Sequence, residues 1–115
     1  MPHDIRAQLR YLSISAQKVR LVVDTVRGKD AVQAMEILRF MPQMAAQPVA
    51  KLLASAVANA EENFGVSRDN LYVAKIFADE APTRKWRRFG ARGRFKPILR
   101  RSSHVTVVLH EREAA

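Results

Sequence analysis

The sequence predicts an α+β fold, in which three helices pack on a small antiparallel three-stranded sheet and one long, basic β-hairpin protrudes from it. Three observations lead to this prediction. Apolar residues repeat with a helical period in three segments, and three others have the alternation or the branched and aromatic residues of strands. A chain of 115 residues, 48% of them hydrophobic, has room for one domain with one core. The net positive charge falls in one segment, between the last two predicted strands.

The first two predicted elements are a strand and a helix. From Ile5 to Arg10 apolar and polar residues alternate, which is the two-residue period of a half-buried strand. Ser15 is a favourable N-cap for the helix that follows, and Gly28 is a favourable residue at its end. The valines between them form one apolar stripe. Lys18 and Arg20 lie off that stripe, on faces open to solvent or to a partner.

Two more helices are predicted in the middle of the chain. Asp30 and Gln33 have capping-box spacing and begin a short helix that ends before Pro42. The next helix has apolar residues repeating over four turns across Pro48–Phe64, and Gly65 ends it. Proline is well suited to the first turn of a helix, because its missing N–H would have no partner there.

The last two strands of the body are predicted at Leu71–Ala78 and His104–His110, and we expect them to pair antiparallel. The intervening segment is too long for an ordinary hairpin loop and too basic to be buried. If both strands continue outward, each strand of about nine residues reaches about 30 Å, against a radius of gyration of about 13 Å for the body. The single domain, 1–115, thus has a body (about 4–80 and 103–112) and an extended basic hairpin, the arm (about 81–102).

The arm carries the whole excess of positive charge. Twenty Lys and Arg against eleven Asp and Glu give a formal net charge of +9. Nine basic residues and no acidic residue lie between Arg84 and Arg101, so the rest of the chain is formally neutral. This distribution indicates a polyanionic partner. Seven of the nine are arginine, which favours dry, permanent contacts with phosphate.

Other functional classes lack their sequence signatures. The chain has no cysteine, which excludes disulfides, thiolate metal sites and a cysteine nucleophile. His104 and His110 have no third metal ligand nearby, and the side chains of the adjacent acids Asp79 and Glu80 diverge on a strand. No phosphate-binding glycine loop, Walker pattern or nucleophile elbow occurs. We therefore expect no enzymatic activity, no metal, no cofactor and no small-molecule substrate.

The sequence also gives no sign of a membrane partner. The first residues have no apolar core of signal-peptide length, and no apolar run of about 18 residues occurs. We expect a soluble protein, for which a reducing cytosol is suitable.

Aromatic residues are interleaved with the arginines of the arm. Trp86, Phe89 and Phe95 can stack on unpaired bases, as the guanidinium plane of arginine also can. Packing against the aliphatic parts of the arm is the alternative role for these three rings. The segment Gly90–Gly93 supplies small residues at the midpoint, where an extended hairpin must turn.

Five motifs stand in order along the chain. They are SAQKVRLVVD (15–24, with RGK at 27–29), ASAVANAEEN (54–63), DEAP (79–82), ARGR (91–94) and SHVTVV (103–108). Together, from about Arg6 to Glu111, the sequence resembles the family of bacterial ribosomal large-subunit protein 22. The resemblance implies an α+β body near the exit of the nascent-peptide tunnel. It also implies a β-hairpin that threads through large-subunit rRNA and whose tip lines the tunnel.

These inferences define the candidate site. The residues expected to bind RNA are Arg10, Lys18, Arg20, Arg84, Lys85, Trp86, Arg87, Arg88, Arg92, Arg94, Lys96, Arg100 and Arg101. The residues of the tunnel-facing tip are Arg88, Phe89, Gly90, Ala91, Arg92, Gly93 and Arg94. The expected partners are large-subunit rRNA, neighbouring large-subunit proteins and, at the tip, the nascent peptide, all on the cytoplasmic ribosome.

Two other interpretations stay open from the residues alone. A basic β-arm with a turn at its tip also suits an architectural DNA-binding protein that wraps the minor groove. Such proteins generally clasp the duplex as dimers, and the sequence gives no sign of a strong dimer interface. A cationic module for membrane surfaces is weaker, because the segment from Arg84 to Arg101 lacks a broad apolar face.

Overall fold

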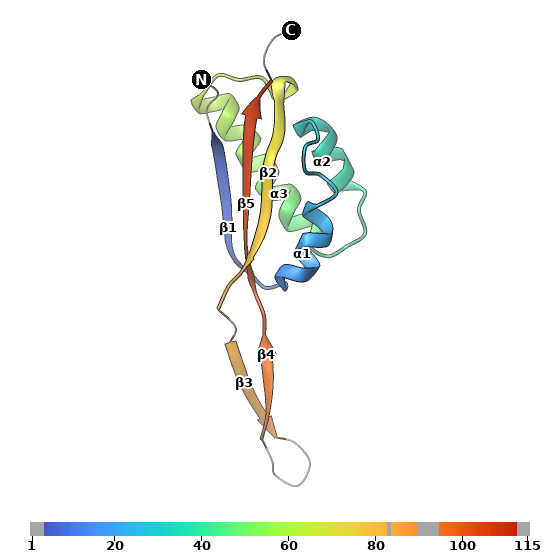
Figure 1. Ribbon diagram of the computed structural model, residues 1–115, viewed down its shortest axis with the longest axis vertical. Coiled ribbons are helices and arrows are strands. Elements are labelled where there is room, and N and C mark those ends of the chain that lie inside the picture. The colour runs from blue at the N-terminus through green and yellow to red at the C-terminus, as the bar shows by residue number, and fades with distance from the viewer. Residues whose placement is uncertain (1–3, 83, 90–94, 113–115) are drawn as a thin grey trace.

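The computed structural model describes residues 4–82, 84–89 and 95–112, with the backbone alone described in the arm strands. The elements, in chain order, are β1 (Ile5–Leu12), α1 (Ala16–Val23), α2 (Ala31–Arg39), α3 (Ala46–Asn63), a 3₁₀ turn (Arg68–Asn70), β2 (Leu71–Glu80), β3 (Arg84–Phe89), β4 (Phe95–Arg100) and β5 (Ser103–Glu111). The helices and the strands β1, β2 and β5 form the body, and β3 and β4 belong to the arm (Figure 1).

The body is a three-stranded antiparallel sheet with the helices on one of its faces (Figure 1). The strand order is β1-β5-β2, so the last strand of the chain lies between the first two. Alternate residues of the sheet, such as Ile76 and Val107, are buried against Val19 of α1 and Leu53 of α3. The predicted α+β class, with three helices on a three-stranded sheet, is confirmed.

The first helix is shorter than the sequence pattern suggested. Ser15 caps it as predicted, since its Oγ accepts a hydrogen bond from the Lys18 N–H at 3.5 Å, but α1 ends at Val23 rather than near Gly28. The following residues form turns that keep Val26 in the core. Gly28 adopts a φ of 79° and donates its N–H to the carbonyl of Val73 at the edge of the sheet. The helix is thus cut short because the chain must reach that edge.

The second helix begins at the predicted place, but without the predicted cap. Asp30 precedes α2, and its carboxylate makes no hydrogen bond to the first turn. Instead it accepts a hydrogen bond from Arg112 Nε at 2.6 Å. The capping-box prediction is therefore wrong, because a charged partner distant in sequence competes successfully with the local backbone N–H groups.

The third helix forms the longest element of the body and runs behind the sheet (Figure 1). It starts two residues earlier than predicted, at Ala46, which leaves Pro48 in the first turn as expected. Gly65 takes a φ of 64° just after the helix, and the N–H of Val66 turns back to the carbonyl of Ala60. This is the glycine-dependent ending that the sequence predicted.

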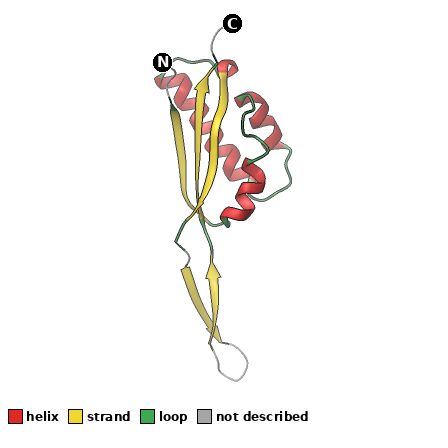
Figure 2. Cartoon of the chain, in the orientation of Figure 1, coloured by secondary structure: helices red, strands yellow, loops and turns green. Residues whose placement is uncertain are grey.

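The arm strands do not simply extend the strands of the body. Strands β3 and β4 form a separate two-stranded antiparallel sheet, joined to the body by short loops (Figure 2). Pro82 lies in one of these loops, and its missing N–H and fixed φ interrupt the ladder between β2 and β5. The chain measures 69 × 26 × 18 Å along its principal axes. The reach of the arm stays a prediction, and the expected turn at Gly90–Gly93, with Arg94, lies outside the described residues.

Candidate nucleic-acid interface

The residues expected to bind RNA fall into two groups. Those on the arm strands are Arg84, Lys85, Trp86, Arg87 and Arg88 on β3 and Lys96 and Arg100 on β4. Those whose side chains are described are Arg10 at the end of β1, Lys18 and Arg20 on α1, and Arg101 between β4 and β5. Arg92 and Arg94 lie outside the described residues.

The register of the arm strands places like charges opposite one another. Arg84 is opposite Arg100, and Arg88 is opposite Lys96. Directly opposed residues of an antiparallel pair have Cα atoms about 4.5–5.5 Å apart, and like charges at such positions destabilise the pairing. A two-stranded sheet is itself only marginally stable in water. An anion bound along the arm would therefore stabilise it.

The arm leaves the body at a point organised by Ser103. This residue is opposite both Leu12 of β1 and Glu80 of β2, so the pairing of all three body strands ends at Ser103. Its side chain is fully buried, and its Oγ donates a hydrogen bond to the carbonyl of Ile14 at 2.9 Å. We call this end of the body, comprising residues 10–20, 78–82 and 101–104, the junction.

The junction brings three exposed cationic side chains to the base of the arm. Arg10 lies two residues before Leu12, Lys18 is in the first turn of α1, and Arg101 is two residues before Ser103. Arg10 donates to the amide of Gln8 at 3.3 Å. None of these cations has a carboxylate partner within the described part of the chain, so their charges are available to an anion.

Arg20, also expected to bind RNA, has a structural contact as well. Its Nε donates to the carbonyl of Ala78 at 3.2 Å, and Arg27 donates in the same way to the carbonyl of Ile76 at 2.7 Å. Both carbonyls belong to β2, an edge strand of the body sheet, whose unpaired groups would otherwise be open to another chain. Arg20 thus covers a sheet edge, and its contact with RNA stays a prediction.

Sequence reasoning missed one residue of the junction, Tyr11. A bulge in β1 between Leu9 and Leu12 gives Tyr11 a φ of 56° and leaves it 59% exposed. For an L-residue other than glycine this left-handed conformation costs roughly 1–2 kcal/mol. The alternating pattern of the strand counts Tyr11 with the core-facing residues, and nothing in that pattern signals the bulge.

His104 holds Tyr11 in this conformation. The Tyr11 N–H donates to Nδ1 of His104 at 3.0 Å, and the two rings meet edge to face with centroids 4.7 Å apart. From the sequence alone, His104 was considered only as a possible metal ligand. The described residues contain no group of three or more histidines, cysteines and acids that could hold a metal ion.

The opposite end of the body, where β1 and β2 begin and β5 ends, pairs several of its charges within the chain. We call it the far end. Arg112 pairs with Asp30 at 2.6 Å, Arg68 with Glu61 at 2.9 Å, and His110 Nε2 lies 2.5 Å from a carboxylate oxygen of Asp4. The hydrogen bond to Glu61, together with the charge of Glu61, raises the pKa of Arg68. The two arginine ion pairs leave less charge for an external partner.

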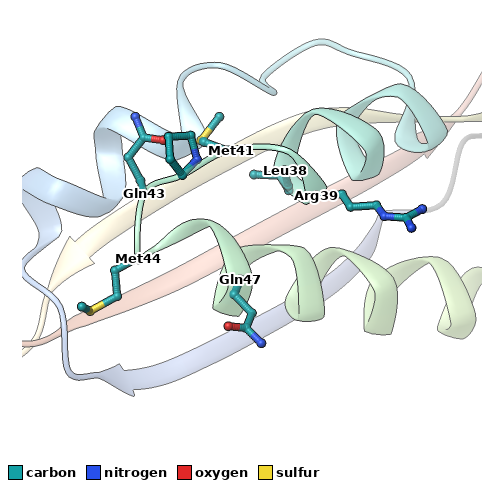
Figure 3. A pocket seen from close by; sticks show the side chains of 7 residues that line it. Leu38, Arg39, Met41, Gln43, Met44 and Gln47 are labelled. Carbon is teal, nitrogen blue, oxygen red and sulfur yellow. The ribbon is translucent and has the colours of Figure 1, made fainter.

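A hollow of about 470 Å³ lies at the loop between α2 and α3. Its lining residues are Leu38, Arg39, Met41, Pro42, Gln43, Met44 and Gln47. Figure 3 shows their side chains spread around the loop rather than converging on one point, with Arg39 directed away from Met44. The lining has a single charged group and no acid or base pair, so it lacks the groups that catalysis requires.

No helix in the described residues is both long enough and apolar enough to cross a membrane.

Comparisons with known proteins connect the arm and the body to one family. The family described as "Ribosomal protein L22p/L17e" matches residues 7–110. A protein of Thermoanaerobacter sp. (strain X514), named "Large ribosomal subunit protein uL22", is 52% identical over 110 residues, covering 96% of this chain and 99% of the relative. A protein of the same name from Thermoanaerobacter pseudethanolicus has the same identity and coverage. The matched segment includes the junction and the whole arm.

Proposed function

The chain belongs to the ribosomal protein L22p/L17e family, and from this premise we propose that it is a structural protein of the large subunit that binds large-subunit rRNA. The family is structural rather than enzymatic, and its members work in the cytoplasmic ribosome. Neighbouring large-subunit proteins are the other partners. Family membership favours rRNA over duplex DNA, the alternative partner of a basic β-arm.

The opposition of like charges in the arm carries this proposal. Arg84 with Arg100, and Arg88 with Lys96, repel one another across a narrow two-stranded sheet. Phosphates on either side of the arm remove this repulsion, and each phosphate that the arm neutralises releases a counterion from the RNA. Arg10, Lys18 and Arg101 extend the same cationic surface onto the body.

We also propose that the tip of the arm, from Arg88 to Arg94, lies at the nascent-peptide exit tunnel. Resemblance to the family suggested this placement, and family membership supports it. Strand β3 ends at Phe89 and is paired there with Phe95, the first residue of β4, so this pair lies at the end of the arm strands away from the body. The nascent peptide is thus the partner of the tip, and rRNA is the partner of the stem, by which we mean the rest of the arm (about 81–87 and 95–102).

Charge-matched variants test the binding of rRNA by the arm. In the stem variant, Arg84, Lys85, Arg100 and Arg101 are changed to Gln. In the control, Gln replaces four exposed body cations that have no carboxylate partner in the described structure: Arg6, Lys29, Lys51 and Lys75. Both variants lose the same charge, so non-specific attraction to RNA falls equally.

The measurement is the binding constant for rRNA extracted from large subunits, over a range of salt concentrations. The slope of log K against log salt is negative, and its magnitude is expected to fall by about 0.7–0.9 for each phosphate that the protein no longer neutralises. We expect the stem variant to neutralise several phosphates fewer than the wild type, and the control to neutralise about as many as the wild type. Equal changes of slope in both variants would show that net charge, not the arm, determines binding.

A further inference from the structure

We propose that Tyr11 is a stacking platform for one unpaired base of the RNA that passes the junction. The inference rests on the proposed function, because the RNA supplies the base. The proposed site differs in chemistry from the phosphate-binding cations of the arm, because it is an aromatic ring on the body.

The backbone of Tyr11 is the first observation. The bulge in β1 requires a residue with positive φ, a position where glycine fits best, and Tyr11 occupies it with a φ of 56°. The surrounding structure must hold a tyrosine in such a conformation. Strain of this kind is concentrated at binding sites. Here its consequence is that a large aromatic ring leaves the core side of the strand and is 59% exposed.

The interaction with His104 is the second observation. The Tyr11 N–H donates to Nδ1 of His104 at 3.0 Å, and the rings lie at 87° to each other. This hydrogen bond requires an unprotonated Nδ1, so the neutral imidazole carries its proton on Nε2. The main chain and the ring of Tyr11 are therefore both fixed by one side chain, 93 residues away in sequence. A platform fixed before binding loses little conformational entropy when a base stacks on it.

The charges around Tyr11 are the third observation. Arg10 precedes it, and Arg101 lies three residues before His104; both are exposed. They can contact the phosphates on either side of a stacked base. On the other side of His104 lies β2, in which Asp79 is directly opposite His104 and Glu80 is the next residue. These acids repel phosphate, so the RNA is expected to approach Tyr11 from the side of β1.

Two other aromatic rings of the body, Phe40 and Tyr72, lack this combination. Phe40 is 75% exposed on the loop after α2, where its backbone φ of −98° is unstrained and the Arg39 guanidinium lies 5.7 Å from the ring centroid. Tyr72 is covered by Arg112, 4.7 Å from its ring centroid, and by His110. Phe40 therefore serves as a matched control for loss of an exposed ring.

Three variants test the platform: Tyr11→Gly, Tyr11→Phe and Phe40→Ala. Tyr11→Gly removes the ring and also relieves the backbone strain, so the protein should melt at the same or a higher temperature. Its affinity for rRNA extracted from large subunits should fall by about 5-fold to 150-fold, the range for losing one base–aromatic stack. Tyr11→Phe and Phe40→Ala should bind like the wild type.

The salt dependence separates stacking from phosphate binding. Because stacking releases no counterion, Tyr11→Gly should lower the affinity by the same factor at every salt concentration and leave the log–log slope unchanged. Unchanged affinity, a changed slope, or an equal loss in Tyr11→Phe or Phe40→Ala would overturn the inference while leaving the arm's role intact. A wild type that failed to bind rRNA would overturn the proposed function, and this inference with it.

Crosslinking in assembled large subunits identifies what lies against Tyr11. After ultraviolet irradiation and nuclease digestion, mass spectrometry should find a nucleotide attached to the peptide that contains Tyr11. A crosslink from Tyr11 to a neighbouring protein would show that this ring faces protein rather than RNA and would overturn the platform.

Discussion

The two ends of the body differ in what they do with their charges. At the far end, Arg112, Arg68 and His110 each face a carboxylate of the same chain. At the junction, Arg10 and Arg101 have no such partner in the described structure, and the acids Asp79 and Glu80 are likewise unpaired. The far end therefore pairs Arg68 and Arg112 within the chain, although Lys29 there has no carboxylate partner in the described structure, whereas the junction leaves its cations open to a partner.

The body and the arm also differ in the contacts that support them. The body buries a continuous core between its helices and its three-stranded sheet. The arm strands pair only with each other, and the register opposes Arg84 to Arg100. Stability and RNA affinity should thus depend on different residues, and the predictions below test that separation.

The largest expected effect is the loss of rRNA affinity on removing the arm. Replacing Arg84–Arg101 with a two-residue turn deletes nine basic residues and leaves eleven basic against eleven acidic ones. The magnitude of the negative salt slope should fall by about 0.7–0.9 for each phosphate left unneutralised, while the body still unfolds cooperatively. Salt titrations and thermal melts measure the two quantities. An unchanged slope would mean that the body supplies the affinity.

The next effect concerns stability alone. Leu53 is fully buried on α3, and Leu53→Ala should lower the free energy of unfolding by about 2–5 kcal/mol because it leaves a cavity. The neighbouring exposed residue supplies the control, since Lys51→Ala should change it by less than about 0.5 kcal/mol. Urea denaturation compares the two. Similar values would contradict the assignment of the buried face of α3.

Within the arm, the tip and the stem should also differ. Changing Arg88, Phe89, Arg92 and Arg94 to Ala should leave incorporation into large subunits nearly intact, because the stem still binds its phosphates. The same variant should reduce crosslinking from a stalled nascent chain to the arm. The stem variant should do the opposite and weaken incorporation. Tip variants that fail to assemble would contradict the division between stem and tip.

Much of this fold could be predicted from local patterns. The valine stripe of α1, the cap at Ser15 and the ending at Gly65 depend on neighbours in sequence, and all three are confirmed. The predictions that failed involve distant partners. Asp30 pairs with Arg112 instead of capping α2, and the chain leaves α1 early so that Gly28 can reach Val73.

The candidate site was predictable to the same extent. A charge run is visible in the sequence, so the cations of the arm could be named as candidates, and their contact with RNA stays a prediction. The exposed position of Tyr11 could not be predicted, because the bulge interrupts the alternation of β1. The residue that holds Tyr11 in place, His104, is 93 residues away in sequence. Similarly, no local pattern indicated that Arg20 donates to the carbonyl of Ala78.

The smallest expected effect is the contribution of the ion pair between Arg112 and Asp30 to the stability of the far end. Arg112 and Asp30 are about half exposed, at 51% and 53%, so water screens their attraction. A double-mutant cycle with Arg112→Ala and Asp30→Ala should give a coupling of only about 0.2–1 kcal/mol in urea denaturation. Neither change should alter the salt slope for rRNA, because both residues lie at the end of the body away from the arm. A slope made shallower by Arg112→Ala would place RNA at the far end too. The difference in charge between the two ends of the body would then not determine where RNA binds.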